Sequence, residues 1–543
     1  MTDHAAAAAD GDAPTPLTIT SRQRVLILVG TLIGMLVAAV SQTIVTTVLP
    51  SIAKDLNGFD LMTWVFTGAM LANAISTPLF GKLSDLYGRR RLYILGVSTF
   101  VAGTLVCALA GDMTVLIVGR VVQGVGMGAI IPLAMAIIAD VVPANERGKW
   151  QGIMGAVFGL ATVLGPLMGG WINDAFGWRW TFWMVLPLGA VALALIITQM
   201  HIPFHPRRAK IDWLGALTFG LGLSALLLAL SEGGRDHPWD SARILGLFAA
   251  AAIALVAFVL VELRASEPLI PMHLFRDRNV WTTTVASFAI GGGMYVGVYF
   301  VPQFMQTVAG LSSSDSGEAL VPLMLGLIIT SVGSGIAVSR TGRYRGMIIA
   351  GPVIGALGLW LLAQLGPDST ILDTAWRCAV LGGGLGLVMQ NVMLVAQNAV
   401  EFRFTGVVTS LLTLARTLGG TVCVAILGTV FATRLADDLQ DEFARVPAAD
   451  AGAIASVDSD SILSAGKGLP ASVQDAIRSA AAETLTHVFL ISIPFLVLAL
   501  VAALLVRRDE LSTESAISVV DELEHELADM VPTDPDHAPT HPH

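Results

Sequence analysis

Long apolar stretches dominate the sequence, and short polar segments separate them. Fourteen stretches are each about 18–27 residues long, which is enough to cross a bilayer as a tilted helix. Their apolar residues are continuous and do not alternate with polar ones, which argues against a transmembrane β-barrel. The pattern therefore predicts an all-α polytopic membrane protein with 14 transmembrane helices. The expected spans are 24–50, 61–81, 92–110, 113–139, 149–171, 180–200, 213–231, 243–262, 280–303, 316–338, 346–366, 375–399, 405–431 and 485–506.

Composition agrees with this pattern. The 543 residues are 54% hydrophobic and 13% charged, whereas soluble domains carry about 25% charged residues. Cys107, Cys378 and Cys423 all fall inside apolar stretches, which predicts small core residues and neither disulfides nor a metal site. No phosphate-binding loop with Gly-Lys-Ser/Thr is present. We therefore expect no enzyme, no cofactor, no metal and no nucleic-acid partner.

Basic residues predict the orientation of the spans. With the N-terminus inside, 20 of the 31 Lys and Arg residues lie in inner segments, 9 lie outside and 2 lie within spans. Four of the outer residues belong to the long segment 432–484, which the positive-inside rule discounts. The bias predicts a multi-pass protein of the cell membrane with both termini in the cytoplasm.

Two basic linkers, 201–212 and 263–279, divide the spans into six, two and six. A Gly-x-x-x-x-Arg-Thr-Gly-Arg string at 335–343 repeats features of the segment 81–91 at the corresponding place in the second six. Such a repeat is typical of two-half transporters with a site between the halves. The expected parts are a disordered lead 1–23, a six-helix bundle 24–200, a linker with two added helices 201–279, a second bundle 280–506 that includes an outer loop 432–484, and an acidic tail 507–543.

The tight connection at 81–91 reads Gly-Lys-Leu-Ser-Asp-Leu-Tyr-Gly-Arg-Arg-Arg. Its glycines permit a sharp turn, and its cations are typical of a cytoplasmic anchor. Its one acid can pair with an arginine or cap a helix N-terminus. The ordered string resembles the signature loop of the major facilitator superfamily, which implies a conformational latch on the cytoplasmic side. The latch residues would be Gly81, Asp85, Gly88, Arg89 and Arg90.

A lone arginine, Arg120, lies inside the fourth span, where a charge is costly and faces the bundle interior. It is either a structural arginine bonded to backbone carbonyls or a charge that tunes a proton site or holds substrate. The string Arg120-x-x-Gln123-Gly124-x-Gly resembles the span 4 motif of the same superfamily.

The fifth span is rich in glycine, which lets helices approach closely, and its proline bends the helix. A general packing motif is one interpretation. The Gly-Pro-x-x-Gly-Gly string also resembles the motif of drug antiporters, which implies a hinge and seal. The residues concerned are Gly155, Gly159, Gly165, Pro166, Gly169 and Gly170.

Several further strings strengthen the resemblance, and the chain is identified as a member of the fourteen-span drug:proton antiporter family. The resemblance implies a major facilitator fold of two six-helix bundles plus two extra helices, and multidrug efflux by a monomer. The strings are Thr43-Ile44-Val45, Trp64-Val65-Phe66-Thr67, Glu146-Arg147-Gly148, Trp178-Arg179-Trp180, Gln397-Asn398-Ala399-Val400 and Arg416-x-x-Gly419-Gly420.

One departure from the family concerns the proton. Ser41 stands where the family commonly has an aspartate, so another group must carry the proton, or coupling has changed. Asp315 and Glu318 open the tenth span one turn apart, where partial desolvation would raise their pKa values. A solvated helix start is the alternative interpretation. Asp140, near the inner end of the fourth span, is the next candidate.

Polar residues at mid-depth predict a central cavity, with helix–helix hydrogen bonding as the competing account. The candidates for the cavity are Ser41, Gln42, Gln390, Asn391 and Arg416. Together these features predict secondary active export of hydrophobic or amphipathic compounds, such as drugs and antibiotics, by proton antiport and alternating access. The expected partners are a small hydrophobic substrate, protons and the lipid bilayer. Export of a cell-envelope lipid or of the cell's own metabolite is an alternative. A sensor or scaffold that does not transport is a third, which the intact loop and antiporter motif disfavour.

Overall fold

The computed structural model describes residues 21–58, 61–142, 144–200, 212–234, 237–311, 320–447, 450–454, 457 and 468–507. The predicted disordered lead up to residue 20, the tail beyond 507 and the acids Asp315 and Glu318 lie outside these ranges. Within them the chain is helical. The first bundle contains α1 (Ser21–Asp55), α2 (Met62–Tyr87), α3 (Arg89–Ala108), α4 (Met113–Val141), α5 (Ala144–Phe176), α6 (Arg179–Trp183) and α7 (Val185–Gln199).

The second bundle follows two intervening helices. These are α8 (Trp213–Glu232) and α9 (Ala242–Glu262), and a short 3-10 helix, η2 (Met272–Arg276), leads from them into the second bundle. That bundle contains α10 (Arg278–Thr307), α12 (Val321–Thr341), α13 (Arg345–Leu362), α14 (Ile371–Asn398), η3 (Phe402–Phe404), α15 (Thr405–Phe443), α16 (Ala451–Ile454) and α18 (Ala471–Leu505).

Local sequence explains where several helices begin and end. Gly88 separates α2 from α3 with φ of 92°, a conformation that favours glycine. Asp112 caps α4 by accepting a hydrogen bond from the backbone N–H of Val115. Thr370 and Asp373 form a capping box at the start of α14. The sharp turn predicted at 81–91 is therefore made by Gly88.

Twelve helices of the described chain are long and apolar enough to cross a membrane, with α6 and α7 counted as one span. The helices α2 and α5 match predicted spans in length but are not among these twelve. Both contact the opposite bundle, and they carry the glycines, hydroxyl groups and amides that such contacts use. Fourteen spans therefore stay a prediction.

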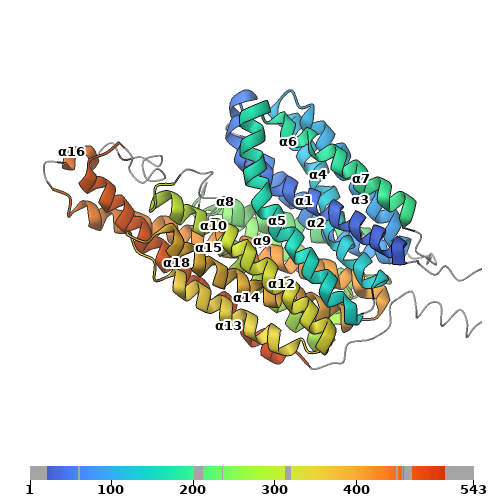
Figure 1. Ribbon diagram of the computed structural model, residues 1–543. Coiled ribbons are helices and arrows are strands. Elements are labelled where there is room, and N and C mark those ends of the chain that lie inside the picture. The colour runs from blue at the N-terminus through green and yellow to red at the C-terminus, as the bar shows by residue number, and fades with distance from the viewer. Residues whose placement is uncertain are drawn as a thin grey trace, which may run out of the picture.

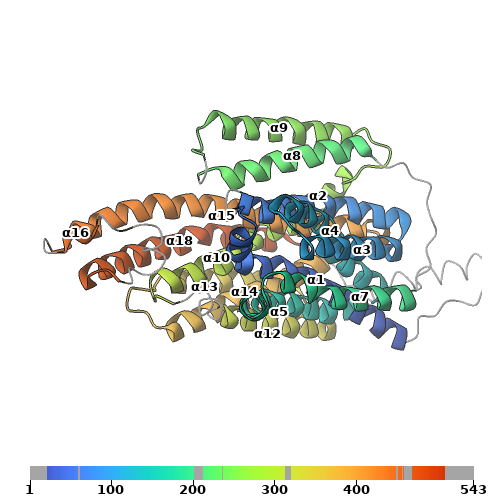
Figure 2. The same ribbon diagram turned by 90° about the horizontal axis from the view of Figure 1, so that it is seen from above.

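The two bundles form the body of the molecule, and the α8–α9 hairpin lies at its periphery (Figures 1 and 2). The α8 helix packs against α2 and α15 through an apolar cluster that includes Phe219, Phe258, Leu411 and Leu414. The two phenylalanine rings have centroids 5.1 Å apart. The added helices therefore contact both bundles.

Two helices extend into the segment predicted as the outer loop 432–484. The α15 helix continues to Phe443, and α18 begins at Ala471, before the expected start of the last span. The hydroxyl of Thr484 donates to Asp438 at 2.5 Å and joins the two helices. The amphipathic helix that the sequence favours near 470–483 is the first part of α18, and apolar residues there, such as Val473 and Ile477, are buried in the bundle.

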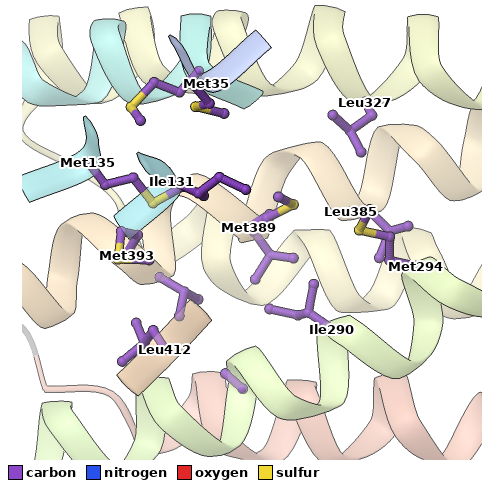
Figure 3. Close-up of a cluster of buried hydrophobic side chains, with 14 of the residues drawn as sticks. Met35, Ile131, Met135, Ile290, Met294, Leu327, Leu385, Met389, Met393 and Leu412 are labelled. Carbon is purple, nitrogen blue, oxygen red and sulfur yellow. The ribbon is translucent and has the colours of Figure 1, made fainter. Parts of the chain in front are cut away.

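The two bundles meet at one end and diverge toward the other (Figure 1). We call the end that carries residues 81–91 the inner end, following the charge prediction, and the opposite end the outer end. Buried methionines and aliphatic side chains from both bundles meet between the halves (Figure 3). This methionine cluster consists of Met35, Ile131, Met135, Ile290, Met294, Leu327, Leu385, Met389, Met393 and Leu412.

Candidate functional site

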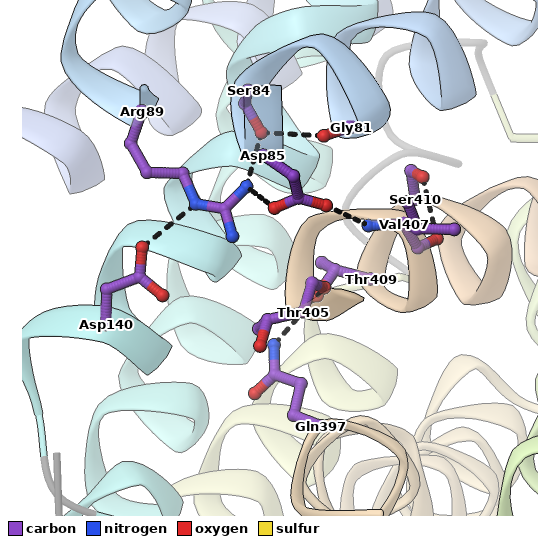
Figure 4. A network of polar contacts seen from close by, with 10 residues as sticks. All are labelled: Gly81, Ser84, Asp85, Arg89, Asp140, Gln397, Thr405, Val407, Thr409 and Ser410. Atoms are coloured by element: carbon purple, nitrogen blue, oxygen red, sulfur yellow. Dashed lines mark hydrogen bonds and ion pairs between the residues drawn. The ribbon is translucent and has the colours of Figure 1, made fainter. Parts of the chain in front are cut away.

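At the inner end, Asp85 connects the two halves (Figure 4). Its carboxylate pairs with Arg89 on α3 and accepts a hydrogen bond from the backbone N–H of Val407 at 3.2 Å. Val407 lies in the first turn of α15, where N–H groups are unpaired and the helix dipole favours a negative charge. Asp85 thus makes both of the interactions that its sequence context allowed, and one of them crosses between the bundles.

Arg89 is held from two sides. Its Nε donates to Asp140 Oδ2 at 2.9 Å, and its Nη1 contacts both Asp85 Oδ1 and Ser84 Oγ. Arg90 points elsewhere and donates to the carbonyl of Ile197 on α7. Asp140, predicted as a spare proton site, is therefore placed in this inner network, while Arg90 stays within its own bundle.

Burial dominates the electrostatics of Asp85. It raises the pKa of Asp85 to about 6, against the attraction of Arg89, and the nearby charge of Asp140 acts in the same direction as burial. The buried contact between the halves therefore favours the protonated form of this carboxyl more than water does.

Other polar contacts close the inner end beside this network. Gln151 on α5 donates to the side-chain oxygen of Gln397 on α14 at 2.6 Å, and Gln397 donates to Thr409 on α15 at 3.0 Å. The backbone N–H of Lys149 donates to Ser339 Oγ at 3.2 Å. Sequence reasoning missed Gln151. The sequence shows only an amide within a glycine-rich helix, and this does not predict a partner on another bundle.

The glycines of α5 serve two different interfaces. A Cβ added at Gly152 would lie 2.7 Å from the carbonyl oxygen of Ser331 and 2.8 Å from Cα of Val332, both on α12 of the other half. Gly155 and Gly159 face the same half, close to Gln390 and Ile328 respectively.

Toward the outer end, α5 faces its own bundle. A Cβ at Gly165 would lie 2.8 Å from Cβ of Thr43 on α1, and one at Gly169 would lie 3.0 Å from the carbonyl oxygen of Ile44. A Cβ at Gly170 would meet nothing within 4 Å. Pro166 lies in the same helix. Within the predicted motif, Gly165 and Gly169 therefore pack α5 against α1, whereas Gly155 and Gly159 pack α5 against the other half.

Arg120 is fully buried in the first bundle, with 1% of its surface exposed. Its Nε donates to the carbonyl of Val65 at 3.3 Å, and another nitrogen donates to the side-chain oxygen of Gln123. Gln123 in turn donates to Ser41 at 2.9 Å and to Thr104 at 2.7 Å. Gly124 packs against the backbone of Ala69. An amide therefore links the span 4 arginine to Ser41, the position where the family commonly has an aspartate.

A pocket lies between the bundles at mid-depth, with a cavity volume of about 40 Å³. Both halves contribute to its walls, which mix apolar and aromatic side chains with amides and hydroxyl groups. The lining residues are Gln42, Asn73, Ala74, Thr77, Ile131, Pro132, Phe158, Met294, Tyr295, Thr413, Leu414, Arg416 and Thr417. A narrower adjoining pocket shares Gln42 and Asn73 and is bordered by Arg120.

The predicted cavity residues divide between the pocket and the helix interfaces. Gln42 and Arg416 line the pocket. Ser41 is bonded to Gln123, and Asn391 donates to the carbonyl of Leu387 on its own helix at 2.6 Å. Gln390 lies beside Gly155, at the contact between the halves. Depth in the membrane was readable from the sequence, but the direction in which each side chain points was not.

Arg416 is the charged residue of the pocket wall. It is 9% exposed, and its guanidinium lies over the ring of Phe158 from the opposite half, 5.9 Å from the ring centroid. Tyr295 is also close enough to interact with it electrostatically. Among the described residues, no carboxylate lines either pocket. In the same part of the chain, no His, Cys, Asp and Glu side chains gather to hold a metal ion.

Comparisons with known proteins agree with this architecture. The sequence profile of the Major Facilitator Superfamily matches residues 31–423. The multidrug transporter protein MdtP of Bacillus subtilis is 40% identical over 420 residues, which are 77% of this chain and 77% of the relative. Multidrug resistance protein 3 of the same organism is 34% identical over 496 residues, covering 91% of this chain and 97% of the relative.

A solved structure resembles the fold at low sequence identity. The crystal structure of the human organic anion transporter MFSD10 aligns with a TM-score of 0.57 and 15% identity, covering 87% of this chain and 99% of that one. At this identity the likeness concerns the fold alone. The relatives at higher identity are transporters and not enzymes, as the sequence predicted.

Proposed function

This chain belongs to the major facilitator superfamily, and on that premise we propose that it exports hydrophobic or amphipathic compounds by alternating access and proton antiport. The observation that carries the proposal is the pocket at mid-depth between two bundles that are joined at the inner end. A site between two rocking halves can open to one side of the membrane at a time. The described conformation, closed at the inner end, corresponds to the state that releases substrate outside.

The lining of the pocket supports the proposed substrate class. Phe158, Met294, Ile131 and Leu414 offer apolar surface, and a few amides and hydroxyl groups can orient a bound molecule. Flexible methionines suit a site that accepts more than one shape. The names of the two Bacillus relatives point to the same class, because both are described as acting on multiple drugs or in drug resistance.

Proton coupling is the finer part of the proposal. The candidates remain Asp315 and Glu318, which lie outside the described residues, and Asp140 in the inner network. Asp140 already pairs with Arg89, so a proton arriving there would weaken the contact that anchors Asp85. We further propose that the protein works as a monomer in the cell membrane, with both termini in the cytoplasm, in keeping with the distribution of basic residues.

The test is efflux by the purified full chain in proteoliposomes with an imposed pH gradient. A hydrophobic dye reports substrate movement, and a pH-sensitive dye reports protons moving the opposite way. Dye movement and proton movement in the opposite direction should both be detected in proteoliposomes, and neither should be detected in protein-free liposomes. Proton movement that does not follow substrate would refute antiport, and the absence of transport for all substrates would refute export.

A locked variant tests alternating access separately. The backbone N–H of Lys149 lies 3.2 Å from Ser339 Oγ across the inner end, so Lys149→Cys and Ser339→Cys can be joined by a short reducible cross-linker. We expect the cross-link to stop efflux and a reductant to restore it. Efflux that continues in the cross-linked protein would contradict movement of the two halves.

A further inference from the structure

Among the residues that the structure describes, the central pocket carries a positive charge and no acid to match it. Arg416 is buried to about nine-tenths of its surface, and its charged group borders the pocket. In the described part of the chain its guanidinium lies over the ring of Phe158 and near the side chain of Tyr295, neither of which carries a negative charge at neutral pH. A charge at this depth is expensive, and it is usually paired or functional.

The surroundings of the pocket do not supply the missing negative charge. The adjoining smaller pocket is bordered by Arg120, which is bonded to a carbonyl and an amide. The acids of the described spans lie at helix ends, such as Asp140 in the inner network and Glu262 at the end of α9. A cationic molecule in the pocket would therefore meet the guanidinium of Arg416 and no carboxylate of the described chain.

From this arrangement we infer that the pocket selects amphipathic molecules that carry an anionic group, such as a carboxylate, on an aromatic or apolar body. A guanidinium binds a carboxylate with two parallel hydrogen bonds, and the bond is strong in a dry site. The apolar body would lie against Phe158, Met294 and Leu414, while Gln42 and Asn73 offer amides to other polar groups. This inference rests on the proposed export function and names the substrate class of the same site.

The arrangement also explains how the anion is held between the halves. Arg416 belongs to α15 of the second bundle, whereas Phe158 belongs to α5 of the first. A carboxylate on Arg416 would neutralise a charge that the Phe158 ring stabilises only in part, since a ring contributes a quadrupole and not a full counter-charge. An anionic ligand thus offsets part of the cost of burying the Arg416 charge at the contact between the two bundles. A neutral ligand of the same shape does not offset this cost.

The experiment compares three dyes built on one xanthene ring system with net negative, neutral and positive charge. Binding to the purified full chain is measured by fluorescence anisotropy, and export is measured in proteoliposomes. We expect the wild type to bind the anionic dye about 10- to 100-fold more tightly than the neutral one, the range expected for hydrogen bonds to a charged group. The cationic dye should bind most weakly.

Variants separate anion binding from a structural role of the arginine. Arg416→Gln should remove the preference for the anionic dye and leave binding of the neutral dye within about threefold, while Arg416→Lys should retain part of the preference. Arg377→Gln is the matched control, because Arg377 also lies over an aromatic ring, 5.1 Å from the centroid of Trp376, but is absent from the pocket lining. This control should behave as wild type.

Three results would overturn the inference. If the wild type binds the cationic dye more tightly than the anionic dye, anion selectivity is excluded, although the proposed export function is not. This comparison uses the wild type alone, so it is valid even if the Arg416 variants fail to fold. Unchanged affinity of Arg416→Gln for the anionic dye would place anion binding elsewhere. If none of the three dyes is bound or exported, the proposed function falls, and the inference falls with it.

Discussion

A methyl group at Gly152 should open the inner end of this transporter. The Cβ of Gly152→Ala would lie 2.8 Å from Cα of Val332 and 2.7 Å from the carbonyl oxygen of Ser331, on the α12 helix of the other half. Carbon atoms in contact ordinarily lie about 3.5–4.0 Å apart. Because the obstacle is backbone, no side chain can rotate away, and α5 and α12 must separate by roughly 0.7 Å.

The cost falls on one conformation of the protein. Overpacking of this kind costs about 1–3 kcal/mol, and the contact exists only when the inner end is closed. The ratio of inner-closed to inner-open molecules should therefore fall by about 5- to 150-fold. The folding stability of each bundle should be unchanged, because Gly152 contacts the opposite bundle.

Spin labels on Lys149→Cys and Arg340→Cys measure this ratio directly. Both side chains are exposed, and Lys149 is next to Ser339 across the inner end. The native cysteines are free and buried, so labelling should spare them. We expect the long-distance population to grow in Gly152→Ala, while Gly170→Ala on the same helix matches wild type because its Cβ meets nothing within 4 Å. A wild-type distance distribution in Gly152→Ala would refute the reasoning.

Three further predictions concern other parts of the same mechanism. Gly165→Ala should lower the melting temperature of the protein, because its Cβ would lie 2.8 Å from Cβ of Thr43 within one bundle; a melting temperature equal to that of Gly170→Ala would contradict this. Ser41→Asp should make export depend more steeply on the pH gradient, because it places a carboxylate against Gln123 and close to Arg120, whereas Ser41→Asn, of similar size, should not; equal pH profiles for the two variants would dismiss the idea. Asp85 has a pKa of about 6 in the closed state and the ordinary 3.8 when solvated, so the closed state binds the proton more tightly. The preference of the protein for the closed state should therefore be gained as pH falls through 6 and lost as pH rises. The ratio measured with the spin labels should change by about tenfold between pH 5 and 7. Asp85→Asn should be insensitive to pH over this range, and equal pH responses of wild type and variant would rule Asp85 out as the titrating group.

Features encoded by neighbouring residues were predictable from the sequence. The apolar stretches correspond to long helices, and the string at 81–91 placed a glycine turn, an acid and arginines where the inner network forms. These predictions succeeded because the chemistry lies within one turn of chain. Helix ends in the outer segment were less predictable. A short amphipathic helix near 470–483 was expected, but its continuity with the last span depends on packing against α15, which the local sequence does not specify.

The walls of the pocket were mostly not predictable. Asn73, Phe158 and Tyr295 are single residues on three helices, and nothing within each helix marks them. Gln390 and Arg416 had the same signal, a polar group at mid-depth, yet one faces α5 at the contact between the halves and the other faces the pocket. Which face of a helix points inward depends on the packing of the other helices, which the local sequence does not specify.

The amide link between Arg120 and Ser41 has a consequence for the energy source. A transporter without a titrating acid at this point can still concentrate an anionic substrate outside the cell, because export of an anion moves negative charge outward. A membrane voltage of 100 mV, negative inside, supplies about 2.3 kcal/mol for each charge moved. That voltage sustains roughly a 50-fold concentration ratio. With Arg120 held by Gln123 and Arg416 bordering the pocket, the proposed export of an anion would draw on the electrical potential in addition to a proton gradient.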